Sequence, residues 1–293
     1  MVYSVLAFLT WGIADLFYKK GNVEEKKYND IKTGIIVGII MGIYATVYLI
    51  VKQVEIDFIE LLKYLPVSLC YISSMIIGYK GLKYIELSLS SPIQNTSGVI
   101  TSLLLIVFFK DLLPPLAYTA FILIFVSIFS IYLMEKKENR NFELNFQKKK
   151  FSLLAIILPI CYCILDGLGT FLDALYLDKF EIISEDMALV AYEYTFLIFA
   201  FICLIYLKYK KEKIHIIKEK NKLLAALFET IGQFFYIFAM SNNSTISATI
   251  VGSYCVLSML LSRIFLKEKL SLKKYIAIFS TILGIIVLLF LDV

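Results

Sequence analysis

Ten apolar stretches, separated by short runs of charged residues, follow one another along this chain of 293 residues. They cover approximately residues 2–18, 33–51, 64–82, 87–109, 115–134, 152–173, 187–207, 222–241, 245–266 and 272–291. Most have about the 20 residues that a helix needs to cross the roughly 30 Å of hydrocarbon in a bilayer. Only helices or closed barrels satisfy the backbone in lipid, and these stretches lack the period-2 alternation of strands. The sequence therefore predicts an all-α integral membrane protein with ten transmembrane helices.

The composition excludes most other classes of protein. Charged residues make up 18% of the chain, against about 25% in soluble domains, and no stretch is polar and long enough for an appended soluble domain. The net charge of +5 comes from loop Lys and Arg, which is usual beside a lipid bilayer, so no nucleic-acid partner is expected. His215 is the only histidine, and all five cysteines lie in apolar stretches. We therefore expect no metal, no haem, no disulfide and no cofactor.

The second half of the chain repeats features of the first half. A shift of 157 residues places Lys110-Asp111 on Lys267-Glu268 and Tyr118 on Tyr275, with no gap across two apolar stretches. Lipid-facing composition does not explain why a basic–acidic pair and a tyrosine recur at the same offset. The sequence therefore predicts two repeats of five helices.

A shift of 151 residues also places Trp11 on Tyr162 and Asp15 on Asp166, near the start of each repeat. Because five is an odd number, two such repeats in one chain must cross the membrane in opposite directions. Inverted repeats are typical of secondary transporters, whose substrate site lies near the membrane midplane between the halves. The expected organisation is a first repeat at 1–134, a basic linker loop at 135–151 and a second repeat at 152–293.

Short motifs along the chain resemble those of a known family. Leu9-Thr10-Trp11-Gly12 resembles the motif that opens the family's first helix. Gly81-Leu82-Lys83-Tyr84 and Ser88–Pro92 resemble the motif across its third and fourth helices. The helix ends that the family repeats are similar to Phe109-Lys110-Asp111 and Leu266-Lys267-Glu268. The chain thus resembles the ten-helix EamA-like branch of the drug/metabolite transporter superfamily. The resemblance implies a fold and the transport of small solutes. It implies no substrate, since members carry amino acids, sugars, nucleotide-sugars or drugs.

The distribution of basic residues predicts the orientation. Counted with the adjoining helix ends, the loops after the odd-numbered helices hold about 24 Lys and Arg, whereas the other loops and the two termini hold about four. Basic loops stay in the cytoplasm, so both termini are expected outside, in a prokaryotic cytoplasmic membrane. The family resemblance implies the opposite orientation for many members, and the charge distribution of this chain is the more direct argument.

Ionisable residues inside the apolar stretches are the first candidates for a site, because burying each in lipid costs about 2.5–3.5 kcal/mol. Glu229 lies eight residues into its stretch, with Gln233 one turn further on the same face. Glu193 stands between two tyrosines, and Asp166 is central in its stretch. Each either lines a cavity or makes a structural hydrogen bond to a neighbouring helix, which is worth about 0.6 kcal/mol on average.

The fourth apolar stretch is unusually polar. Pro92 should kink it, and a broken helix in lipid must face protein or water, so Gln94 and Asn95 are further candidates; small-residue packing explains the polar residues equally well. Aromatic faces beside carboxylates suit a cation. The candidate substrate- or ion-binding residues are Trp11, Asp15, Gln94, Asn95, Asp166, Tyr192, Glu193, Tyr194, Glu229, Gln233 and Tyr236.

These features favour a secondary transporter of a small polar or cationic metabolite or amphiphile. The chain has no Walker motif, and the sixth to eighth stretches contain no central Lys or Arg to bind an anion. Protons are a possible coupling ion, through Glu229 or Glu193. The alternatives are a multipass membrane enzyme and a structural or assembly subunit. An enzyme would normally have clusters of His, Asp or Ser at the interface, whereas the loops here contain little except Lys and Glu. A structural subunit would not need charged residues at mid-depth. The oligomeric state stays open.

Overall fold

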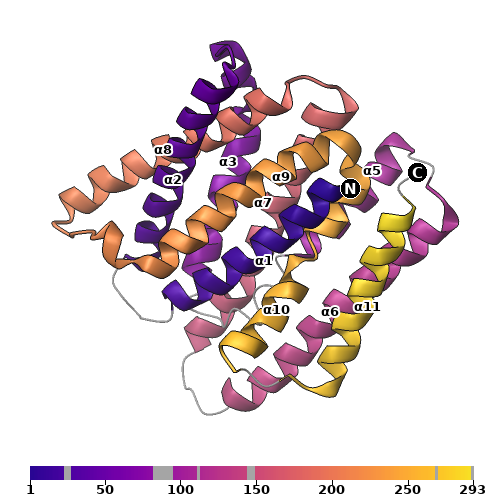
Figure 1. Ribbon diagram of the computed structural model, residues 1–293. Coiled ribbons are helices and arrows are strands. Elements are labelled where there is room, and N and C mark those ends of the chain that lie inside the picture. Colours follow the sequence, from indigo (N-terminus) through magenta and orange to yellow (C-terminus); the bar gives the residue numbers. More distant parts are fainter. Residues whose placement is uncertain (23–27, 82–94, 111–112, 144–148, 268–269, 292–293) are drawn as a thin grey trace.

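The protein is all-helical in the computed structural model (Figure 1), which describes the chain apart from residues 23–27, 82–94, 111–112, 144–148, 268–269 and 292–293. The described residues form helices and connecting segments and contain no strand. The elements are α1 (Val2–Asn22), α2 (Asn29–Lys52), α3 (Phe58–Gly81), α5 (Thr96–Phe109), α6 (Pro115–Glu143), α7 (Lys149–Ala174), the π-helical turn η1 (Leu175–Lys179), α8 (Glu185–Tyr209), the 3-10 turn η2 (Ile216–Lys218), α9 (Lys220–Val251), α10 (Tyr254–Phe265) and α11 (Leu272–Phe290).

Seven of the described helices are long and apolar enough to cross a membrane. They are α2, α3, α8, α9 and α11 with the apolar parts of α6 and α7, while α5 and α10 are shorter apolar helices. The described residues therefore support a multi-pass membrane protein, and the number of ten transmembrane helices stays a prediction. Helices α6 and α7 also extend into the segment 135–151 that was expected to be a loop, to Glu143 and from Lys149.

The helix bundle has two ends of different charge. Helices α2 and α8 pack antiparallel, because the Tyr48 hydroxyl near the end of α2 donates a hydrogen bond to Asp186 at the start of α8, with 2.6 Å between the oxygens. The loops 53–57 and 180–184 therefore lie at the same end, and neither contains Lys or Arg. The loop 210–219 lies at the other end and contains four lysines. We refer to these as the acidic end and the basic end.

Equivalent helices of the two halves run in opposite directions. Gly21, at the end of α1, packs against Lys222, at the start of α9, so α1 runs from the acidic end to the basic end. Tyr64, near the start of α3, donates a hydrogen bond to Asp173, near the end of α7. Since α3 starts at the acidic end, α7 runs from the basic end to the acidic end, opposite to α1.

The packing of one half has a counterpart in the other half. Helix α1 packs along α9 as α7 packs along α3, and α1 touches α10 as α7 touches α5. Helices α2 and α8 form a pair with each other, as do α6 and α11 (Figure 1). This arrangement fits a pair of repeated units, each of which supplies one member of every pair.

The helix break predicted between 241 and 245 is present, and a second break was not predicted. The chain turns at Asn243 (φ −161°, ψ 87°), within the segment 220–251 that carries the single label α9. The Ser247 hydroxyl beyond the turn donates a hydrogen bond to the Ala239 carbonyl oxygen before it at 2.9 Å, so the chain doubles back there. The Asn243 side-chain oxygen then caps the continuing helix by accepting a hydrogen bond from the Ile246 N–H at 3.1 Å. The helix expected at 245–266 was predicted to be continuous, yet it breaks at Gly252 and Ser253, between α9 and α10.

The break at Gly252 is explained by packing, since the stretch 245–266 contains no proline. At this point α9 crosses α5 so closely that a Cβ atom built on Gly252 would lie 3.0 Å from the Cα of Gly98. With the 157-residue shift, Ser253 corresponds to Thr96, the first residue of α5. Because α10 begins at Tyr254, the two halves begin a short helix within one residue of equivalent positions, close to the crossing. The predicted kink at Pro92 lies outside the described residues.

Candidate functional site

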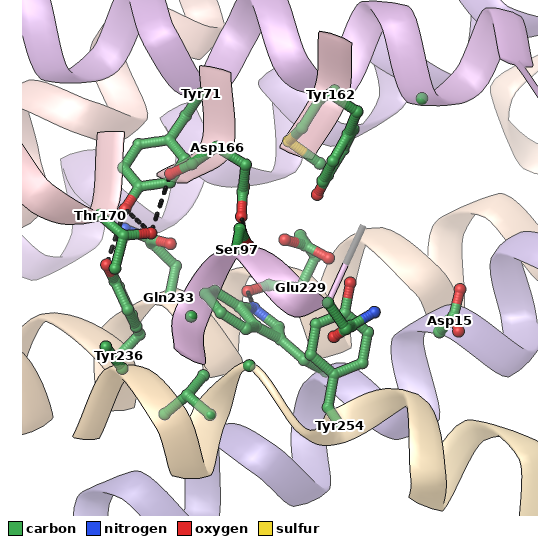
Figure 2. A pocket seen from close by; sticks show the side chains of 18 of the residues that line it. Asp15, Tyr71, Ser97, Tyr162, Asp166, Thr170, Glu229, Gln233, Tyr236 and Tyr254 are labelled. Carbon is green, nitrogen blue, oxygen red and sulfur yellow. Dashed lines mark hydrogen bonds between the residues drawn. The ribbon is translucent and has the colours of Figure 1, made fainter. Parts of the chain in front are cut away.

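A pocket lies between the two halves, lined by side chains from α1, α3, α5, α7, α8, α9 and α10 (Figure 2). It encloses about 970 Å³ of empty space, counted with its open side. Its walls include α5 and α10, which both begin at the pocket with Ser97 and Tyr254 in their first turns. The pocket is thus built where the short helices α5 and α10 begin.

Two aspartates occupy related places on this pocket. Asp166 of α7 accepts a hydrogen bond from the Ser97 hydroxyl of α5, with 2.6 Å between the oxygens. Asp15 of α1 accepts a hydrogen bond from the Ser258 hydroxyl of α10. Each aspartate on the first helix of one half is therefore held by a serine on the short helix of the other half. The pair Asp15 and Asp166 is the pair that the 151-residue shift aligns.

Glu229 of α9 provides a third carboxylate. In Figure 2 its side chain lies between Asp166 and Asp15, and it is close enough to both for their charges to interact. Gln233 lies one turn further along α9 on the same pocket. Among the described residues that line the pocket, none is Lys, Arg or His.

Aromatic rings form much of the remaining wall. The Trp11 ring lies 5.0 Å from the Tyr236 ring and 5.9 Å from the Tyr254 ring, measured between centroids. The Tyr18 and Tyr79 rings lie 5.4 Å apart. The close approach of α1 to α9 depends on Gly232, because a Cβ there would lie 2.3 Å from the Trp11 ring.

One wall of the pocket is a layer of hydrogen bonds around Tyr71. The Tyr71 hydroxyl lies 2.6 Å from the Tyr236 hydroxyl, 2.8 Å from an Asp173 carboxylate oxygen and 3.2 Å from the Thr170 hydroxyl. Asp173 is fully buried behind this wall, where Tyr64 donates a hydrogen bond to its other oxygen. Since Tyr64 and Asp173 lie toward the acidic end, this layer closes the pocket on that side.

Most of the sequence-predicted residues meet at this pocket. The residues that line it are Trp11, Asp15, Asn95, Asp166, Tyr192, Glu229, Gln233 and Tyr236. Gln94 lies outside the described residues. Their role in binding stays a prediction.

Two predicted residues lie elsewhere. Glu193 follows Tyr192 on α8, and one residue further round a helix turns the side chain about 100° away, out of the pocket. Glu193 is fully buried close to Tyr44 of α2, and within the described part of the chain neither of its carboxylate oxygens has a hydrogen-bond partner. The Tyr194 hydroxyl lies 3.3 Å from the Thr46 hydroxyl on an exposed face of the α2–α8 pair.

The sequence interpretation missed several residues of the site. Asp173 lies seven residues after Asp166, so both fall on one face of α7, and this spacing could have indicated it. The periodicity of α3, which places Tyr71, Met75 and Tyr79 along one face, was a second unused signal. Ser97 and Tyr254 could be recognised only once the starts of α5 and α10 were known.

Comparison with known proteins agrees with this architecture. The profile of the EamA-like transporter family matches residues 1–133 and 153–290. A solved structure titled only "Crystal structure of protein" superposes with a TM-score of 0.73 at 11% sequence identity, covering 99% of this chain and 96% of the other. At that identity the likeness concerns the fold alone. No curated protein matches the sequence.

Proposed function

Because this chain belongs to the EamA-like transporter family, we propose that it is a secondary transporter that carries a small polar or cationic solute across the cytoplasmic membrane. The observation that supports this most directly is the pocket between the two halves, with three carboxylates on its wall. Burying charged groups inside a membrane protein is expensive, and such groups mark solute and ion pathways. A structural subunit has no need of them.

We also propose that the chain forms ten transmembrane helices in two inverted repeats. The opposite directions of α1 and α7 support this, as do the paired helix contacts between the halves. Half-helices that start at a midplane site are a recurring feature of inverted-repeat transporters, and α5 and α10 have this form.

Transport by alternating access requires that the pocket open to each side in turn. In this conformation the layer around Tyr71 closes the pocket toward the acidic end. Opening on that side must separate α3 and α7 from α9, because Tyr71, Asp173 and Tyr236 join these helices.

The first prediction concerns Glu229. The protein is reconstituted in vesicles preloaded with amino acids, amines, sugars or nucleosides, and exchange of the labelled solute is measured. We expect exchange for at least one of these classes and a decrease of about tenfold or more in Glu229→Gln, since a lost charged contact costs roughly 1.5–3 kcal/mol. Glu193→Gln, on the neighbouring helix but outside the pocket, should retain exchange.

Two results would contradict the proposal. Vesicles containing the protein could exchange every solute no faster than empty vesicles, which would argue against transport itself. Alternatively, Glu229→Gln could exchange at the normal rate while Glu193→Gln does not, which would move the site to the α2–α8 interface. Melting temperatures of both variants, measured in parallel, show that each is folded.

The second prediction concerns orientation. Glu181 at the acidic end and Lys211 at the basic end are both exposed loop residues. In a variant without the native cysteines, Glu181→Cys should react with a membrane-impermeant maleimide in intact cells, whereas Lys211→Cys should react only after permeabilisation. The reason is that lysine-rich loops remain in the cytoplasm. The reverse labelling pattern would place both termini inside.

A further inference from the structure

The charge of the pocket is strongly one-sided. Asp15, Asp166 and Glu229 line it, and no basic side chain is present among its described lining residues. We infer that the pocket binds an organic cation, a protonated or quaternary amine attached to an aromatic or other apolar body. The inference rests on the proposed function and names the chemical class of the transported solute.

The aromatic wall supports the same class of solute. Trp11 meets Tyr236 and Tyr254 at angles of 30° and 71° between ring planes, so the three rings present both faces and edges at one side of the pocket. A cation over the face of an aromatic ring is attracted by the ring quadrupole, most strongly for Trp. The same rings provide apolar surface for the body of the solute.

A carboxylate-bearing solute fits this pocket poorly. Its only positive partners among the described lining would be the starts of α5 and α10, each worth about half a positive charge. The end of α9 at Val251 lines the same pocket and carries about half a negative charge. Three carboxylates outweigh these partial charges, so a solute with a net positive charge is preferred over a zwitterion, and a zwitterion over an anion.

The arrangement of the lining residues indicates where the two parts of such a molecule would lie. Figure 2 shows Asp15 and the Tyr71 layer on opposite sides, with Glu229 between them. An amine near Glu229 would therefore place its aromatic body beside Trp11 and Tyr254.

Three probes with the same phenyl body and different charge test the inference. They are phenethylamine as the cation, phenylalanine as the zwitterion and 3-phenylpropionate as the anion, each added to the purified protein in a thermal-unfolding measurement. Phenethylamine should raise the melting temperature by roughly 2 °C or more at saturation, phenylalanine by less and 3-phenylpropionate not at all. Benzyltrimethylammonium should act like phenethylamine, because charge and not hydrogen bonding selects the solute.

Variants locate the binding. By calorimetric titration, Asp166→Asn and Glu229→Gln should each weaken phenethylamine binding by about tenfold or more. Glu193→Gln, a buried carboxylate outside the pocket, should bind as the unaltered protein does. Equal weakening in all three variants, or none in the two pocket variants, would contradict a cation site in this pocket.

Failure of the substrate class and failure of the transport function give different results. If phenylalanine or 3-phenylpropionate stabilises the protein at least as well as phenethylamine, or if neither cation stabilises it, the organic-cation class is wrong. The proposed function still holds in that case if the vesicles exchange another solute in a Glu229-dependent manner. If no solute is exchanged, it is the transport function that fails.

Discussion

Replacing Gly98 by alanine should destabilise the protein severely, although alanine is the better helix former. A Cβ atom at Gly98 would lie 2.2 Å from the carbonyl oxygen of Ala248 and 3.0 Å from the Cα of Gly252. Both obstacles are backbone atoms, one in α9 and one in the residue that follows it, so no side chain can rotate away. We expect a loss at or above the upper end of the roughly 1–3 kcal/mol that overpacking costs. Thermal unfolding and the monodisperse fraction on size exclusion measure it.

Gly167 is the matched control for this substitution. It lies on α7, at the same junction, but a Cβ there would have its nearest neighbour, the Ser97 Cβ, at 3.7 Å, an ordinary contact. Gly167→Ala should therefore be neutral or stabilising by up to about 1 kcal/mol, the gain in helix propensity. If Gly98→Ala and Gly167→Ala unfold at the same temperature, the close crossing of α5 and α9 is not a feature of the folded protein.

The overall organisation follows from the sequence because lipid imposes simple rules. Long apolar stretches must be helices, and an odd number of helices per repeat forces opposite directions. The family can also be recognised from the sequence, because Lys110-Asp111 and Lys267-Glu268 recur at equivalent positions of the two halves. The match of Asp15 with Asp166 was the most informative sequence signal, because both residues line the pocket. It paired two residues that lie 151 positions apart.

The details of the site could not be predicted for identifiable reasons. Glu193 and Glu229 look alike in the sequence, as carboxylates at similar depth in apolar stretches. Only the rotation of each helix, which depends on its packing partners, decides that Glu229 lines the pocket and Glu193 does not. The break at Gly252 depends on a long-range crossing with Gly98, and residue propensities contain no information about that contact.

The layer that closes the pocket should also be sensitive to a single substitution. Tyr236, Tyr71 and Tyr64 direct their hydroxyls into a chain that ends on the two oxygens of Asp173, which is fully buried. In Asp173→Ala the Tyr64 hydroxyl loses its acceptor, whereas the Tyr71 hydroxyl can still donate to Thr170. Each buried donor left unsatisfied costs about 1–3 kcal/mol, and helix partners in a membrane recover part of this. We expect a destabilisation of roughly 1–3 kcal/mol.

The comparison of Asp173→Asn with Asp173→Ala separates the lost hydrogen bonds from the lost charge. Asparagine keeps the shape of the side chain and one acceptor oxygen, so it should retain most of the stability that alanine loses. Tyr64→Phe combined with Asp173→Ala should cost less than the sum of the single changes, because one orphaned hydroxyl is removed. Tyr194→Phe, whose hydroxyl makes only an exposed 3.3 Å contact with Thr46, should change the melting temperature very little. If Asp173→Ala unfolds at the temperature of the unaltered protein, the layer contributes nothing to stability. Opening the pocket toward the acidic end would then have no hydrogen-bond barrier to overcome.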